Sequence, residues 1–236
     1  MATQARGDAI TQKTNRREQQ CRHYTPDRGI VASAANNKIY TPLTRTEGDT
    51  LPAHTISSAD SQVVKRYEMA PEEFAKFYPP LLDWIQTTLT ASAGVAETVA
   101  TRGFWRLPLY FTEETLTSAK VVLVDPLPMP PLSSMGLAHF AEFERGIFEG
   151  ITYIDTFFLK PTQANNENMH FHELVHVIQW RLLGPDRFLF SYANGLERFG
   201  YRQSPLEAMA YDAEAAFASS TAIFNVEKMV AAKLGL

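Results

Sequence analysis

The segment NENMHFHELVHVIQW, Asn166 to Trp180, gives the strongest indication of the fold and of a functional site. It holds three of the chain's six histidines. His172, Glu173 and His176 form the pattern His-Glu-x-x-His. Four residues advance a helix by about 400°, so the two histidines lie one turn apart on the same face. Two neutral imidazoles at this spacing suit zinc. Glu173 lies about 100° round the helix, where it can reach a metal-bound water without ligating the metal.

The residues around the motif predict a buried helix. Aliphatic side chains make it apolar nearly all round: Leu174, Val175, Val177 and Ile178. Buried His and Glu side chains need partners, which a metal would supply. The alternative is a pair of core histidines bonded to backbone or carboxylates. His170 points about 200° away from His172, so we expect it to be a hydrogen-bonding residue at the mouth of the site, not a ligand.

The best candidate for a third ligand lies downstream of the motif. Glu207, in SPLEAMAYDAE, is 31 residues after His176 on a later predicted helix. A capping box between Ser204 and Glu207 would explain the same residues without any metal. Glu214 is the main rival ligand.

The two segments together resemble the gluzincin zinc metallopeptidases. The resemblance rests on His-Glu-Leu-Val-His at 172–176 and on the Glu-x-x-Ala element at 207–210, and it covers residues 145–220, roughly a third of the chain. It implies that Glu207 is the third ligand of one Zn²⁺. It also implies an α+β, zincin-like fold: a small N-terminal mixed sheet, the active-site helix below it and a helical C-terminal part. The strand before that helix would be Gly150 to Lys160, along whose edge a peptide could pair.

The sequence departs from the thermolysin-like form of these enzymes near Glu207. Leu206 replaces an Asn, and Tyr211 stands where an Asp usually orients a zinc histidine. We therefore expect Glu214, or alternatively Asp212, to hydrogen-bond a zinc-ligating histidine and orient it.

The resulting functional prediction is hydrolysis of a peptide or amide bond in a peptide or protein substrate. Glu173 would take a proton from the zinc-bound water and pass it to the leaving amine. Tyr201, Arg202 and Tyr211 are the candidates for stabilising the oxyanion, and we predict catalytic roles for the two tyrosines. The alternative is a non-hydrolytic zinc-binding domain with a structural or partner-binding role, although such a site has no use for Glu173. A helical interaction domain without metal is a third possibility.

Composition narrows the class of protein further. With 236 residues, 45% of them hydrophobic, the chain is long enough for one substantial core. A net charge of −4 argues against nucleic acid and against a charged membrane surface. The sequence shows neither a signal-peptide core nor a run of about 18 apolar residues, so we expect a cytoplasmic protein. The single cysteine, Cys21, is expected to be an exposed free thiol.

Residue types divide the chain into two regions. Every Phe and Trp lies at or after Phe74, and the first 60 residues are rich in polar types. We predict a flexible polar arm over 1–65 and a single domain over 66–236, with its sheet in 66–160 and its helices in 161–236.

Finer elements follow from the turn residues. Pro79-Pro80 is expected to separate two helices, and Gly184-Pro185 to stop and restart the histidine helix. We also predict strands at FWRLPLYF (104–111), AKVVLVD (119–125) and GITYIDTFFLK (150–160), with a proline-rich connector after the second.

Overall fold

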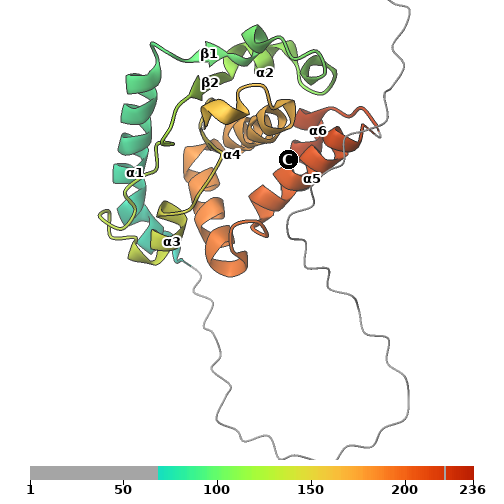
Figure 1. The fold of residues 1–236 in the computed structure, drawn as a ribbon. Coiled ribbons are helices and arrows are strands. Elements are labelled where there is room, and N and C mark those ends of the chain that lie inside the picture. Colours follow the sequence, from blue (N-terminus) through green and yellow to red (C-terminus); the bar gives the residue numbers. More distant parts are fainter. Residues whose placement is uncertain (1–68, 221) are drawn as a thin grey trace, which may run out of the picture. The chain divides into compact units, whose positions relative to one another are not determined.

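The computed structural model describes residues 69–220 and 222–236, which form an α+β fold (Figure 1). The α-helices are α1 (Pro71–Ser92), α2 (Glu113–Ser118), α3 (Ala141–Glu144), α4 (Glu167–Phe199), α5 (Pro205–Ser219) and α6 (Val226–Leu234). The strands are β1 (Glu97–Thr98), β2 (Lys120–Leu123), β3 (Gly150–Tyr153) and β4 (Thr156–Leu159). Short 3-10 helices are η1 (Val99–Arg102), η2 (Leu107–Leu109), η3 (Ala138–Phe140) and η4 (Pro161–Gln163). The predicted arm, 1–65, and Cys21 lie outside the described residues.

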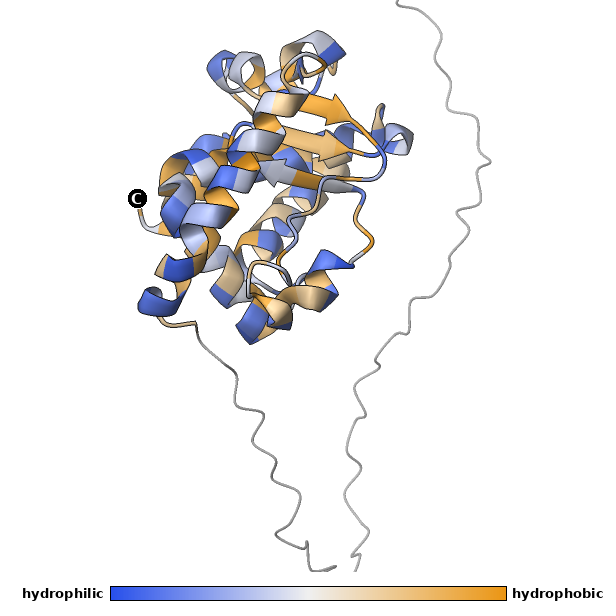
Figure 2. Ribbon diagram, turned by 90° about the vertical axis from the view of Figure 1, so that its left-hand side faces the viewer, coloured by the Kyte–Doolittle hydropathy of each residue, from blue (hydrophilic) through white to orange (hydrophobic). Residues whose placement is uncertain are grey.

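The four strands form one small mixed sheet in the order β1-β2-β4-β3. β2 and β4 are parallel, and β3 pairs antiparallel to β4 along the outer edge. All four residues of β4 are buried, as expected for a central strand covered on both faces. The central strands are strongly hydrophobic in Figure 2. The prediction of a small mixed sheet within the first part of the domain is confirmed.

Residues 150–160 make a hairpin, so the prediction of one long strand there was wrong. β3 and β4 are joined by Ile154 and Asp155, and Ile154 has a left-handed backbone with φ of 58°. The turn carries no Gly or Asn, the residues that most often adopt such a conformation, so the sequence predicted one continuous strand. The hairpin places β3 at the sheet edge, where α4 packs against it.

The segment 104–111 is not a strand, contrary to the prediction. It contains η2, and its buried residues Leu107, Tyr110 and Phe111 follow helical spacing, i, i+3 and i+4. Trp105 and Leu109 are exposed, so the apparent apolar run does not correspond to one buried face.

The prolines at 79 and 80 do not separate two helices, because α1 continues through both. Each proline removes one helical hydrogen bond, which frees the carbonyls of Ala75 and Lys76. All four of these residues are exposed, so water can bind the freed carbonyls. The inner face meanwhile buries Leu81 and Ile85 against the core.

α4 organises the molecule, because it packs against β3 and β4, α1, α5 and α6. Residues 170–180 are all buried, which confirms the prediction of a buried helix around the two motif histidines. Gly184 has non-helical angles (φ 74°, ψ 162°), so α4 kinks before Pro185 and runs on to Gly200, as predicted from these residues. Within the described ranges no helix is both long and apolar enough to cross a membrane.

Candidate metal centre

His172 and His176 project from successive turns of α4 into the interior. Asn166 caps the helix with its side chain, accepting a hydrogen bond from the backbone N–H of Met169, so the helix is already regular when it reaches the pair. The two Nε2 atoms lie 3.2 Å apart, and both side chains are buried. Two ligand atoms at about 2.0–2.1 Å from a tetrahedral ion are about 3.3 Å apart. The imidazoles therefore stand at the separation expected of two zinc ligands.

Glu207 on α5 completes a group of three. Its Oε2 is 3.5 Å from Nε2 of His172, and its Oε1 is 3.4 Å from Nε2 of His176. Ser204 begins α5 without a capping hydrogen bond from its side chain, so the capping box is not formed and Glu207 is turned inward. Its Oε2 is buried and has no hydrogen-bond donor in bonding geometry. The three residues can therefore hold a metal ion.

Each histidine is oriented by a partner on its other ring nitrogen. Nδ1 of His172 lies 3.1 Å from Oε2 of Glu214, and Nδ1 of His176 lies 2.8 Å from Oε1 of Gln179. Both partner oxygens accept, since Glu214 is a carboxylate and the Gln179 amide nitrogen already donates to the carbonyl of Leu206. In the neutral form of each ring, Nδ1 would carry the proton and Nε2 would offer its lone pair to a metal ion.

Glu173 is held in place from strand β3. The Thr152 hydroxyl donates a 2.6 Å hydrogen bond to Oε2 of Glu173. Gly150 approaches the other oxygen so closely that an added Cβ would lie 2.4 Å from Oε1. The Nε1–H of Trp180 donates to the carbonyl of Thr152, which ties the strand back to α4. The carboxylate is therefore fixed beside the metal-binding group without belonging to it.

The electrostatics of the buried group favour a positive charge at its centre. Burial alone would lower the pKa of His172, but Glu207 and Glu214 outweigh it and raise the pKa to about 10. Burial alone would raise the pKa of Glu207, but His176 and His172 hold this pKa well below its ordinary value. Burial raises the pKa of Glu173, against the opposing effect of the histidines. Three carboxylates around two imidazoles thus create a site that a proton or a metal cation stabilises.

The two tyrosines predicted to be catalytic lie in different places. Tyr201 lines a cavity beside Glu207, and its hydroxyl donates a hydrogen bond to the hydroxyl of Tyr211. Tyr211 lies against the His172 ring, with centroids 4.6 Å apart, and the guanidinium carbon of Arg202 lies 4.2 Å from the centroid of the Tyr211 ring. Burial raises the pKa of both phenols, so both keep their proton at neutral pH. Of the two tyrosines only Tyr201 lines the cavity, and its hydroxyl can donate there once it turns away from Tyr211.

The structure corrects one expectation near the motif. His170 does not lie at the mouth of the site, because it is fully buried between Phe104 and Phe157 and its Nδ1 bonds the carbonyl of Asn166. Burial lowers its pKa to about 4, so the ring is neutral at pH 7.

Three residues that hydrogen-bond to side chains of the site were not predicted from the sequence. They are Thr152, Gln179 and Tyr192, whose hydroxyl donates a 2.6 Å hydrogen bond to Oε1 of Glu207. Gln179 lies three residues after His176 and so shares its helical face, a signal that could have been used. The other two sit on β3 and on the second half of α4, and only the tertiary fold brings them to the site.

Comparison with family models, curated proteins and solved structures gives no match for this chain. One ligand atom from each of the three residues lies within 4.8 Å of the other two, and the two imidazole nitrogens, 3.2 Å apart, match the ligand spacing of a tetrahedral ion.

Proposed function

We propose that the protein is a zinc-dependent peptidase. Its zinc ligands would be His172, His176 and Glu207. The observation that carries the proposal is the combination of three buried ligand atoms with a fourth group, Glu173, fixed beside them but outside the ligand set. Two imidazoles and one carboxylate are the ligands of many catalytic zinc sites, which keep a fourth position for water. A structural zinc site is instead closed by four protein ligands.

Zinc, when bound, would lower the pKa of a coordinated water toward about 7 and polarise a carbonyl. Side chains of the protein would carry out the proton transfers and bind the oxyanion. Glu173 would accept the proton of the attacking water and return it to the leaving amine. Tyr201, which stays protonated and lines the cavity, would turn its hydroxyl from Tyr211 and donate a hydrogen bond to the developing oxyanion.

The gluzincin resemblance and a zincin-like fold form part of the same proposal. Edge strand β3 lies against the helix that carries the His-Glu-x-x-His motif, and the Glu207 helix packs against that helix. An extended peptide could pair with the outer edge of β3 and so pass close to Glu173. This arrangement supports a peptide or protein substrate.

The proposal is tested by measuring the zinc content and hydrolytic activity of the purified full-length chain. Elemental analysis should give about one zinc per chain, and a mixed peptide library followed by mass spectrometry should show cleavage that a chelator abolishes and added zinc restores. Zinc binding without any cleavage would favour the non-hydrolytic alternative. Absence of stoichiometric zinc would contradict both.

A further inference from the structure

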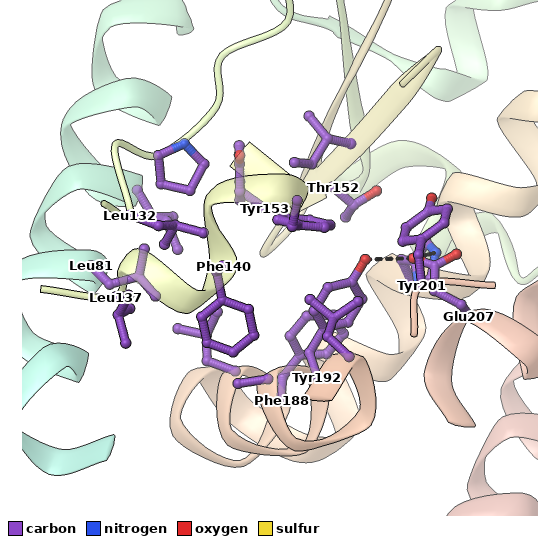
Figure 3. A pocket seen from close by; sticks show the side chains of 18 of the residues that line it. Leu81, Leu132, Leu137, Phe140, Thr152, Tyr153, Phe188, Tyr192, Tyr201 and Glu207 are labelled. Carbon is purple, nitrogen blue, oxygen red and sulfur yellow. Dashed lines mark hydrogen bonds and ion pairs between the residues drawn. The ribbon is translucent and has the colours of Figure 1, made fainter. Parts of the chain in front are cut away.

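Arg202 lies in the turn between α4 and α5, directly after Tyr201. Tyr201 and Glu207 lie at the same end of the cavity (Figure 3). The guanidinium carbon of Arg202 is 4.2 Å from the centroid of the Tyr211 ring, and that centroid is 4.6 Å from the centroid of the His172 ring. Arg202 therefore places a positive charge at the edge of the candidate metal centre.

Arg202 is exposed, and its side-chain N–H groups are available to a ligand. Across residues 69–220 and 222–236, no ion pair or side-chain hydrogen bond is found for Arg202. Arg102, Arg106 and Arg181, by contrast, each donate hydrogen bonds to carbonyl or hydroxyl groups of the protein. The guanidinium of Arg202 thus differs from these three in having no structural partner for its donors.

The contact with Tyr211 holds the guanidinium and leaves its edge open. A guanidinium stacks on an aromatic ring through its face, whereas its five N–H donors point outward in its plane, in a fork that matches a carboxylate. Tyr211 is itself partly buried and packs against His172, so the surface on which Arg202 rests is fixed. A side chain that is already held loses less conformational entropy when it binds an anion. Arg202 is therefore prepared to bind a planar anion.

The other charges near the centre would repel an anionic substrate. Three carboxylates, those of Glu173, Glu207 and Glu214, surround the two imidazoles, and the whole chain has a net charge of −4. A substrate carboxylate would therefore approach the centre favourably only where a cation meets it directly. A peptide advances by at most about 3.6 Å per residue. A carboxylate one or two residues from a scissile bond held beside Tyr201 thus comes within reach of the next residue, Arg202.

We infer that Arg202 selects peptide substrates by binding a carboxylate one or two residues from the scissile bond. The carboxylate comes from an Asp or Glu side chain or from the C-terminus of the peptide. The inference rests on the proposed peptidase function and adds a substrate class to it. Because a bidentate pair with a carboxylate is stronger than a hydrogen bond to a neutral amide, the matched Asn, Gln or amidated peptide should be a poorer substrate.

The experiment incubates the zinc-loaded full-length chain with a synthetic peptide library, prepared with free and with amidated C-termini, and quantifies the products by mass spectrometry. Wild type should cleave the carboxylate form of a site roughly 3- to 30-fold faster than its amide form. Asp and Glu are compared with Asn and Gln, and free C-termini with amidated ones, so the comparison that shows the preference identifies the source of the carboxylate.

Three variants test whether the preference depends on Arg202. Arg202→Gln should bring the ratio of carboxylate to amide cleavage to about one, and Arg202→Lys, which keeps the charge without the fork, should retain part of the preference. Lys228→Gln removes a cation from an exposed position on α6, is the matched control, and should keep the wild-type ratio. An equal rate for both forms in wild type, or a wild-type ratio in Arg202→Gln, would overturn the inference. So would an equal loss on both forms in Arg202→Gln, because it would place Arg202 at the reacting carbonyl.

A binding measurement separates this inference from the proposed function. Immobilised, zinc-loaded Glu173→Gln protein is exposed to the same peptide library, and it should retain the carboxylate forms roughly 3- to 30-fold more than the amide forms, whereas the protein that also carries Arg202→Gln should not. Such retention without any cleavage by wild type would overturn the peptidase proposal while keeping Arg202 as a carboxylate-binding residue. Cleavage by wild type with equal retention of both forms would overturn the role of Arg202 alone.

Discussion

The hydrogen bond from Thr152 to Glu173 gives a prediction whose size follows from the structure. The hydroxyl lies 2.6 Å from a buried carboxylate oxygen, and the strand that carries it is tied to α4 through Trp180. A hydrogen bond to a charged group contributes about 1.5–3 kcal/mol. Thr152→Val keeps the shape of the side chain and removes only the donor. Because about 1.4 kcal/mol changes a rate tenfold, kcat/KM should fall by about 10- to 150-fold if this bond holds Glu173 in its reactive position.

The assay compares wild type, Thr152→Val and Thr152→Ser for kcat, KM and zinc content. We expect the Val variant to lose kcat while KM and zinc content stay near wild type, since the metal ligands are unchanged and Val keeps the shape of the Thr152 side chain in the cavity wall. The Ser variant retains the hydroxyl and should recover most of the activity. A Val variant as active as wild type, or a Ser variant as impaired as the Val variant, would refute the reasoning that this bond positions the base.

Three further predictions concern the ligands, the glycine and pH. Glu207→Ala should lose its zinc in elemental analysis, whereas Glu214→Ala should still bind zinc with an affinity reduced about 10- to 100-fold. Full zinc content in Glu207→Ala would exclude Glu207 as a ligand. Gly150→Ala places a Cβ 2.4 Å from Glu173, so urea unfolding should show a loss of about 1–3 kcal/mol, and unchanged stability would contradict this contact. Metal-free protein should lose stability as pH rises from 6.5 toward about 10, because the pKa of His172 is raised from 6.5 to about 10 in the folded protein and the stabilising charge is complete only below the lower value. Denaturation with chelator at pH 6, 8 and 10 measures this, and a stability that does not change with pH would contradict the prediction.

The sequence predicted best those site residues whose positions follow from helical periodicity. His172, His176 and Glu207 come together in the structure as predicted, because the first two depend only on helix geometry and the third on the next long helix packing against α4. Glu214 also lies where it was expected to orient His172. Gly184 and Gly200 mark the helix boundaries, as their freedom to adopt positive φ suggests.

The elements that were predicted wrongly depend on tertiary contacts. Ile154 adopts a left-handed conformation that no local signal announces for a β-branched residue, so the β3-β4 hairpin was taken for one strand. Pro79 and Pro80 are tolerated within α1 because their side of the helix is exposed, a property that the sequence alone does not contain. Thr152 is a site residue only because that hairpin places β3 against α4.

The most direct test of the proposed peptidase is a side-by-side measurement of zinc content and peptide hydrolysis for wild type and Glu173→Gln. The change keeps the size of the side chain and removes the base, and Glu173 lies outside the group of three ligands. The account predicts equal zinc in both proteins and hydrolysis reduced by about 100-fold or more in the variant. Equal activity of the two proteins would show that Glu173 is not the base and would contradict the proposed mechanism.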